Sequence, residues 1–157
     1  MPRIGLISDT HGLLRPEAAA FLRGSDFIVH AGDIGNEQVL EGLEALAPVT
    51  AVRGNNDKGP WADGIQETAI LDVDGVSIYV LHDIAAMSLD PAAAGFRVVV
   101  SGHSHRPSSK TEHGVLYVNP GSAGPRRFKL PISLGELQVH DGSVTSRHFE
   151  IEVSRRA

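Results

Sequence analysis

Aspartate and histidine recur in five short motifs, each placed directly after an apolar run. They are Asp9-Thr10-His11-Gly12, Gly32-Asp33, Gly54-Asn55-Asn56-Asp57, His82-Asp83 and Gly102-His103-Ser104-His105. Carboxylates and imidazoles, in a chain without cysteine, suit borderline divalent metals such as manganese, zinc, iron, cobalt or nickel. The spacing Asp-x-His predicts a carboxylate and an imidazole on the same side of an extended segment, and His103 and His105 repeat it. The motifs together predict a metal site.

Each motif alone has a simpler structural explanation. Asp9 and His11 could cap a turn at a strand end, Asp33 could form an Asx turn, and Asn55 could cap a loop. A histidine at a strand end, such as His82, is often packed in a core. The presence of all five motifs in order favours metal ligation over these separate explanations.

The first half of the chain alternates strand and helix patterns. This alternation of apolar strands and helices predicts a parallel sheet covered on both faces. In such sheets a site forms beyond the carboxyl ends of the strands, where the motifs stand. The expected strands are Arg3–Ser8, Phe27–His30 and Val49–Arg53, and the expected helices are Pro16–Leu22 and Asn36–Ala47, the second capped by Asn36.

The second half is rich in strands and has one expected short helix, near Asp90–Ala94. Hairpin turns are predicted at Val73-Asp74-Gly75 and His140-Asp141-Gly142, and loops at Lys58–Gly64 and Gly121–Lys129. We expect one mixed α/β domain with two sheets over residues 1–157. The expected strands are Gln66–Leu71, Val76–Leu81, Arg97–Ser101, Val115–Val118, Ile132–Val139 and Ser143–Ile151.

Composition limits the classes of function. The net charge of −5 argues against an extended nucleic-acid surface, which needs a basic face. The lack of cysteine excludes disulfides and thiolate zinc sites. No leader pattern is present, and no run approaches the ~18 apolar residues of a membrane span. We therefore expect a soluble cytoplasmic protein that does not interact with a membrane.

The ordered motifs resemble the signature of calcineurin-like metallophosphoesterases, especially the small single-domain bacterial and archaeal phosphodiesterases. The late segment Asn119-Pro120-Gly121-Ser122 also matches this branch. The resemblance implies a four-layer α/β/β/α sandwich of two mixed β-sheets flanked by helices. It also implies a dinuclear metal site and a tendency to form homo-oligomers. By position, Asp9, His11 and His105 would bind the first metal, Asn55, His82 and His103 the second, and Asp33 would bridge them.

Simple charge arithmetic fits this ligand set. Two divalent ions bring four positive charges and the two aspartates remove two, which leaves enough for one hydroxide and one singly charged diester. We therefore expect a metal-dependent phosphodiesterase, acting on a small phosphoester by attack of a metal-bridging hydroxide. The metals would be two divalent ions, with manganese favoured. The predicted catalytic residues are Asp9, Asp33, Asn55 and His103.

Two other functions remain open on the same fold. A phosphomonoesterase or nucleotidase would use the same ligands. A catalytically idle scaffold, similar to a eukaryotic membrane-sorting subunit of this family, is the other alternative. That subunit has lost metal ligands, whereas all seven ligand positions here hold competent residues.

Several further residues have predicted roles around the ligands. Asp57 and His30 would orient the ligand imidazoles or the asparagine, although simple packing is the alternative for His30. Asn56, Arg126 and Arg127 are candidate substrate contacts, and the arginines could instead be a solvated loop pair.

Two residues depart from the pattern of the resembled family. Asn56 stands where many larger members have a histidine that assists the leaving group, and an amide cannot act as a general acid. Asp83 stands where this branch often has glycine. Its side chain could add negative charge near the second metal or point to solvent.

Overall fold

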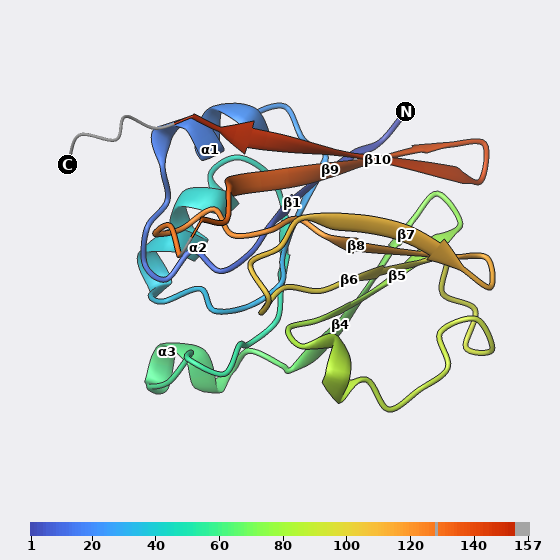
Figure 1. Cartoon of the computed structure of the whole chain (residues 1–157), viewed down its shortest axis with the longest axis horizontal. Helices are drawn as coiled ribbons and strands as arrows, with labels where there is room; N and C mark the ends of the chain where they lie inside the picture. Colours follow the sequence, from blue (N-terminus) through green and yellow to red (C-terminus); the bar gives the residue numbers. More distant parts are fainter. Residues whose placement is uncertain (128, 153–157) are drawn as a thin grey trace.

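The computed structural model describes residues 1–127 and 129–152, which form two five-stranded sheets joined by loops and short helices (Figure 1). The first sheet has the order β10-β9-β1-β2-β3 and the second β4-β5-β6-β8-β7. The strands are β1 (Arg3–Ile7), β2 (Phe27–His30), β3 (Val49–Ala51), β4 (Thr68–Val73), β5 (Val76–Leu81), β6 (Val98–Val100), β7 (Ser108–Glu112), β8 (Val115–Asn119), β9 (Ile132–His140) and β10 (Ser143–Ile151).

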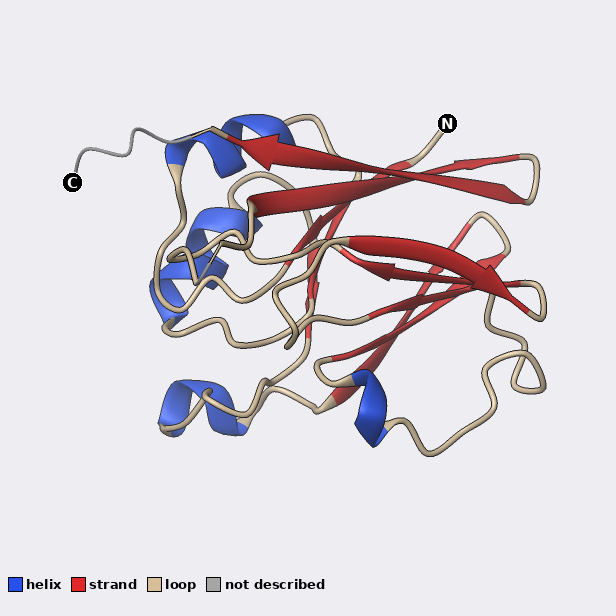
Figure 2. Ribbon diagram, in the orientation of Figure 1, coloured by secondary structure: helices blue, strands red, loops and turns tan. Residues whose placement is uncertain are grey.

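The two sheets lie face to face (Figure 2). A layer of buried apolar side chains fills the space between them. Alternate residues of a strand point to opposite faces, so each central strand contributes every second side chain to this layer. In β1, Ile4 and Leu6 lie between the sheets, whereas Ile7 points to the outer face. The layer is completed by the buried valines and isoleucine of the second sheet, including Ile78, Val80, Val98, Val100 and Val118.

Helices cover the outer face of the first sheet. The helices α1 (Pro16–Leu22) and α2 (Glu37–Glu44) bury Leu22 and Leu43 against Ile7 and Ile28. Asn36 caps α2 as expected, since its side chain accepts a hydrogen bond from the Val39 N–H at 3.1 Å. In the part of the chain that the structure describes, no helix has the length and apolar character needed to cross a membrane.

The outer face of the second sheet has a thinner cover. The 3-10 helix η1 (Ile84–Ala86) and the following loop place Met87, Leu89 and Phe96 against this face. The prediction of a helix near Asp90–Ala94 is wrong. Asp90 caps a single turn instead, with its Oδ1 atom accepting from the Ala92 N–H at 3.1 Å, and Gly95 ends that turn at a φ of 88°.

The architecture of two mixed sheets in an α/β sandwich confirms the expected fold class. Both predicted hairpins are present, joining β4 to β5 and β9 to β10. Among the described residues, three elements were not expected, and η1 is one of them. The strand β7 was missed because all five of its residues are exposed and it lacks an apolar alternation, and the expected loop at 58–64 contains the short helix α3 (Pro60–Asp63).

The parallel arrangement of neighbouring strands brings the motif segments together at one edge of each sheet. In the first sheet β1, β2 and β3 run parallel, and in the second sheet β5, β6 and β8 run parallel. The carboxyl ends of parallel strands meet at one edge of a sheet, so the segments that follow these strands converge. These are the segments that contain Asp9, Asp33, Asn55, His82 and His103.

A buried carboxylate fastens the first sheet on its outer face. Glu136 of β9 is 2% exposed and forms ion pairs with Arg3 of β1 and Arg147 of β10. Both guanidinium groups also lie over the ring of Phe21 in α1, at 5.0 and 5.6 Å from its centroid. Burial acts to raise the pKa of Glu136, but the hydrogen bonds from Arg3 and Arg147 lower it below its ordinary value.

We expect Glu136→Gln to lower the free energy of unfolding by about 2 kcal/mol, because charge-assisted hydrogen bonds are replaced by neutral ones. Since the folded-state pKa is lowered, the advantage of the wild type is full above the ordinary pKa of 4.5 and declines as the pH falls below it. Urea unfolding at pH 7 and pH 3.5 measures this. The exposed Glu150→Gln is the control, and an equal loss in both variants would contradict the prediction.

Candidate metal centre

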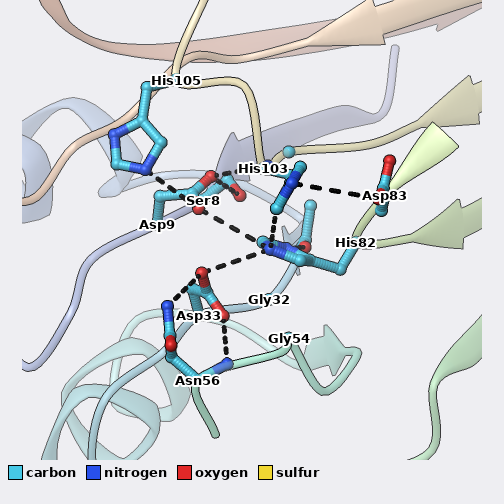
Figure 3. A network of polar contacts seen from close by, with 12 residues as sticks. Ser8, Asp9, Gly32, Asp33, Gly54, Asn56, His82, Asp83, His103 and His105 are labelled. Carbon is cyan, nitrogen blue, oxygen red and sulfur yellow. Dashed lines mark hydrogen bonds and ion pairs between the residues drawn. The ribbon is translucent and has the colours of Figure 1, made fainter. Parts of the chain in front are cut away.

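Asp9 presents one free carboxylate oxygen to a group of imidazoles. It follows β1 and is fully buried. Its Oδ2 atom accepts hydrogen bonds from Ser8 Oγ at 2.6 Å and from the His103 N–H at 3.1 Å. Its Oδ1 atom has no hydrogen-bond partner among the described residues, and lies 3.4 Å from His105 Nε2 and 3.9 Å from His82 Nε2 (Figure 3). A buried anionic oxygen of this kind requires a compensating positive charge.

The ring orientation of His82 is fixed from behind. Its Nδ1 atom lies 2.8 Å from the carbonyl oxygen of Ala31, and a carbonyl only accepts, so Nδ1 carries a hydrogen. The Nε2 atom therefore faces Asp33 Oδ2, at 3.2 Å. An imidazole nitrogen and a carboxylate approach this closely only with a positive charge between them, either a proton or a metal ion.

Asp33 is held from the opposite side by Asn56. The Asn56 backbone N–H donates to Asp33 Oδ1 at 2.9 Å, and its side-chain amide donates to Oδ2 at 3.1 Å. The second oxygen also lies 3.9 Å from His11 Nε2. Asp33 thus stands between His11 and His82, with its orientation set by the loop that follows β3.

Burial and hydrogen bonding shift the pKa values of Asp9 and Asp33 in opposite directions. Burial raises the pKa of Asp9 above its ordinary value, against the Ser8 hydrogen bond that acts to lower it. Burial also acts to raise the pKa of Asp33, but hydrogen bonds from His82 and the Asn56 N–H hold it well below its usual range. For His82, burial acts to lower the pKa, and the contacts with Asp33 and Ala31 raise it overall. A divalent cation would stabilise both carboxylates in their ionised form.

The donor atoms form two groups that share Asp9. The ligand atoms of Asp9, His11 and His105 lie within 4.8 Å of one another, and so do those of Asp9, Asp33 and His82. His11 Nε2, like Asp9 Oδ1, is buried and has no partner among the described residues. Oxygen and imidazole donors with unused lone pairs fit divalent cations. Asp33 Oδ2 also approaches the first group, at 3.9 Å from His11 Nε2, so Asp33 as the bridge between two metals stays a prediction.

Two predicted ligands stand at the rim rather than in these groups. The side chain of His103 is 48% exposed, with its Nδ1 atom 3.3 Å from His82 Nε2 and its Nε2 atom 3.9 Å from Asp83 Oδ2. Asn55 is exposed and lines a cavity of about 270 Å³ together with His82 and His103. This space, which is also lined by Arg53 and Gly54, is called the inner cavity below.

Asp57 fastens two ligand loops through their backbones. Its buried carboxylate accepts from the Gly54 N–H at 2.9 Å, the Ile34 N–H at 3.1 Å and the Gly35 N–H at 3.0 Å. These bonds tie the loop after β3 to the loop that contains Asp33. The sequence prediction had Asp57 orienting an imidazole or Asn55, whereas its recorded bonds are to main-chain donors.

His30 has a similar position behind the ligands. The Thr10 hydroxyl donates to the Ile34 carbonyl at 2.8 Å, so it accepts from His30 Nε2 at 2.9 Å, and His30 Nδ1 accepts from the Gly32 N–H at 3.1 Å. Complete burial lowers the pKa of His30 to about 3, which keeps the ring neutral at neutral pH. The ring joins the loops after β1 and β2 and contacts no ligand imidazole through these bonds.

The ligand segments are not extended, which corrects the geometry expected from the Asp-x-His spacing. Asp9, His11, Asp33, His103 and His105 all have φ between 47° and 71°. This left-handed region is uncommon for residues with a side chain, and each such residue costs of order 1–3 kcal/mol. In the segments 9–11 and 103–105, left-handed residues alternate with ordinary ones and bend the chain, so the side chains come from tight loops instead of from one face of a strand.

Close packing of the loops explains two motif glycines. A Cβ atom at Gly54 would overlap the backbone nitrogen and Oδ1 of Asp33, and one at Gly102 would overlap Ser8 Oγ. The neighbours are backbone or hydrogen-bonded atoms that cannot move away cheaply. Both positions therefore require glycine because of space, although neither has a positive φ.

The last residue of β8 has a role that the sequence did not reveal. Asn119 donates from its amide to the Gly102 carbonyl at 2.9 Å and to Ser104 Oγ at 3.1 Å, which holds the His103–His105 turn in place. Ser8, which orients Asp9, was also missed. The sequence marked Asn119 only as part of the segment 119–122 that matches the resembled branch, and the signal for Ser8 was a polar residue at the end of an apolar strand.

The arginines proposed as substrate contacts lie at the edge of the site. Arg126 and Arg127 are both exposed. The positive charge of Arg127 acts on His105, whose pKa is lowered first by burial and also by this charge. Arg127 is therefore near the first group of donor atoms, whereas Arg126 forms no ion pair with this group among the described residues.

Comparison with known proteins agrees with the donor set. The sequence model of the calcineurin-like phosphoesterase superfamily domain matches residues 2–142. The chain belongs to this superfamily. The resemblance inferred from the motifs is therefore confirmed, and the family supplies divalent metal chemistry as the setting for these ligands.

Relatives are found among archaeal proteins. A probable metallophosphoesterase of Methanocaldococcus jannaschii is 34% identical, over 88% of this chain and 76% of the relative. A protein named phosphodiesterase from the same organism is 29% identical, over 76% of this chain and 82% of the relative.

Solved structures share the fold at lower identity. An archaeal phosphodiesterase superposes with a TM-score of 0.79 at 22% identity, covering 95% of this chain and 99% of the other. Vps29 from Entamoeba histolytica, solved with Zn²⁺, has a TM-score of 0.71 at 22% identity, covering 94% and 98%. At these identities the likeness concerns the fold alone.

We expect Asp57→Ala to lower the free energy of unfolding by about 3 kcal/mol, because three backbone N–H groups lose their acceptor. We also expect about tenfold weaker Mn²⁺ binding, because the Asp33 and Asn55 loops are no longer tied together. Urea unfolding and calorimetric titration measure the two effects. The exposed Asp63→Ala is the matched control, and unchanged metal affinity in a destabilised Asp57→Ala would refute the positioning role.

Proposed function

We propose that this protein is a phosphodiesterase that uses two divalent metal ions. The single observation that carries the proposal is the buried Asp9 Oδ1 atom, which has no hydrogen-bond partner among the described residues and faces the imidazoles of both ligand groups. Within a phosphoesterase superfamily, such an oxygen is best explained as a metal ligand. We assign Asp9, His11 and His105 to one ion and Asp33, His82, His103 and Asn55 to the other, with Asp9 and Asp33 placed to contact both.

The chain's own residues orient the ligands. Ser8 and the His103 N–H hold one oxygen of Asp9, so the other is directed into the site. Ala31 fixes the His82 ring, and Asn56 fixes Asp33. When bound, a pair of divalent ions supplies an activated water molecule at neutral pH and stabilises charge at phosphorus. The protein therefore contributes rigid placement, with little rearrangement left for the reaction itself.

Two considerations favour a diester over a monoester. Four positive charges from two ions, less two carboxylates, leave two positive charges, which one hydroxide and one singly charged phosphodiester would neutralise. In addition, one archaeal relative is named a phosphodiesterase. Manganese is the metal that we propose, because the donors are carboxylate, amide and imidazole groups without sulfur.

A scaffold without activity is the second candidate, since Vps29 shares this fold. The ligand set disfavours it. A scaffold need not maintain five left-handed non-glycine residues around an uncompensated buried carboxylate, because both features cost stability.

We expect chelated protein to hydrolyse bis(p-nitrophenyl) phosphate only after Mn²⁺ is added back. We expect Asp33→Ala and His103→Ala to lower kcat/KM by at least about a hundredfold. Mn²⁺ should also raise the Tm of the wild type, because an ion that binds only the folded state stabilises it. Turnover that persists after chelation, or in both the Asp33→Ala and His103→Ala variants, would contradict the metal mechanism. Faster turnover of p-nitrophenyl phosphate would favour the monoesterase alternative.

The leaving group should depart without a general acid. The Asn56 amide donates a hydrogen bond to Asp33, and an amide is too weak an acid to protonate a leaving group. We therefore expect kcat/KM to fall by about a hundredfold or more from a p-nitrophenyl methyl diester to a dialkyl diester. Rates measured under the same Mn²⁺ concentration test this. Equal rates for the two diesters would show that some group donates a proton to the leaving oxygen.

A further inference from the structure

Two cavities meet at the pair Asp83 and His103. The inner cavity lies on the His82 side. A second space of about 430 Å³, the outer cavity, lies between η1 and the strands β7 and β8. Its lining includes Ile84, Met87 and Tyr117, and Asp83 and His103 line both spaces. The outer cavity has the size of a small-molecule site.

Asp83 is held in place rather than directed only to solvent. Its Oδ1 atom accepts from the Ala85 N–H at 3.0 Å, which starts η1. Its Oδ2 atom lies 3.9 Å from His103 Nε2, and the side chain is 42% exposed (Figure 3). The capped oxygen fixes the carboxylate at the mouth of both cavities. The sequence left open whether the Asp83 side chain lies near the second group of predicted ligands or points to solvent. In the structure it lies next to His103.

The other charged side chains that line the two cavities form ion pairs with each other. In the inner cavity Arg53 pairs with Glu67 at 3.2 Å. In the outer cavity Lys110 pairs with Glu112 at 3.7 Å. Among the arginine, lysine and carboxylate side chains, each lining then has one positive and two negative groups. Before any bound metal ion is counted, this gives a net charge of −1, which comes from Asp83.

The outer cavity is suited to an uncharged group. Ile84, Met87 and Tyr117 offer apolar and aromatic surface, and Ser104 and Asn119 offer neutral polar atoms. Within the part of the chain that the structure describes, its single cation, Lys110, is already paired. A second phosphate group placed there would find no free cation and would face Asp83.

We propose that Asp83 restricts this site to phosphodiesters whose two substituents are uncharged, with the larger substituent in the outer cavity. This inference rests on the proposed phosphodiesterase function and names its substrate class. Asp83 acts on specificity through its charge. It repels substrates with an additional anionic group and has little effect on those without one.

The test compares two esters that differ only in charge. Thymidine 5′-(p-nitrophenyl phosphate) has a neutral nucleoside substituent, and its 3′-phosphorylated analogue has an additional dianion. The ratio of their kcat/KM values cancels differences in metal loading. We expect the wild type to prefer the first compound, and Asp83→Asn to reduce this preference about fivefold by improving only the charged compound, as removal of one half-exposed charge would.

Asp83→Asn keeps the size of the side chain and the oxygen that caps Ala85. Asp90→Asn is the matched control, because Asp90 caps a turn in the same outer layer but lines neither cavity. Its preference should equal that of the wild type. The preference in the wild type should also shrink at about 1 M salt, where the screening length falls to about 3 Å.

Calorimetric binding of both esters to Mn²⁺-supplemented protein separates the two proposals. If neither ester is hydrolysed, the phosphodiesterase proposal fails, while the ratio of the binding constants in wild type and Asp83→Asn still tests the role of Asp83. An unchanged ratio in Asp83→Asn overturns the inference. So does an equal loss for both esters with weaker Mn²⁺ binding, which would show that Asp83 acts by orienting His103.

Discussion

The unequal environment of the two Asp9 oxygens is the constraint on which the centre depends. One oxygen accepts hydrogen bonds from the Ser8 hydroxyl and from a backbone N–H of the loop after β6. The second has no hydrogen-bond partner within residues 1–127 and 129–152. The contact with the His103 N–H requires the loops after β1 and β6 to meet. The geometry of the centre therefore depends on the packing of the sheets. A shift of one sheet relative to the other would break the hydrogen bond to Asp9 Oδ2 and rotate Oδ1 out of the site.

The polar residues behind the ligands follow from the same requirement. Loops at strand ends lack the hydrogen bonds of a sheet, and buried backbone groups must find partners. Asp57 accepts three N–H groups on one side of the centre, and Asn119 donates to Gly102 and Ser104 on the other. The left-handed loops are thus paired internally. This is how the fold maintains strained residues around a cluster of titratable groups.

Prediction from the sequence succeeded where periodicity decides the outcome. The helix capped by Asn36 and the hairpin at Asp141 follow from local patterns, and the motifs follow strands because parallel strands deliver residues to one edge. Prediction failed where tertiary contacts decide. No pattern shows that Asp9 is left-handed, that Asp57 bonds backbones, or that a fully exposed strand β7 closes the second sheet. The meeting of these residues at one edge of the sheets was foreseeable, but the way they are held was not.

The thin outer layer of the second sheet connects the fold to specificity. A long helix over this face would fill the space beside β8, whereas η1 and a loop leave a cavity of about 430 Å³ next to His103. Asp83 belongs to both features, since one of its oxygens starts η1 and the other charges the cavity mouth. A glycine there could provide neither the cap nor the charge. One residue therefore starts η1 and adds a negative charge beside the candidate centre. If Asp83 acts as proposed, substrate choice could change without any change in the metal-binding residues.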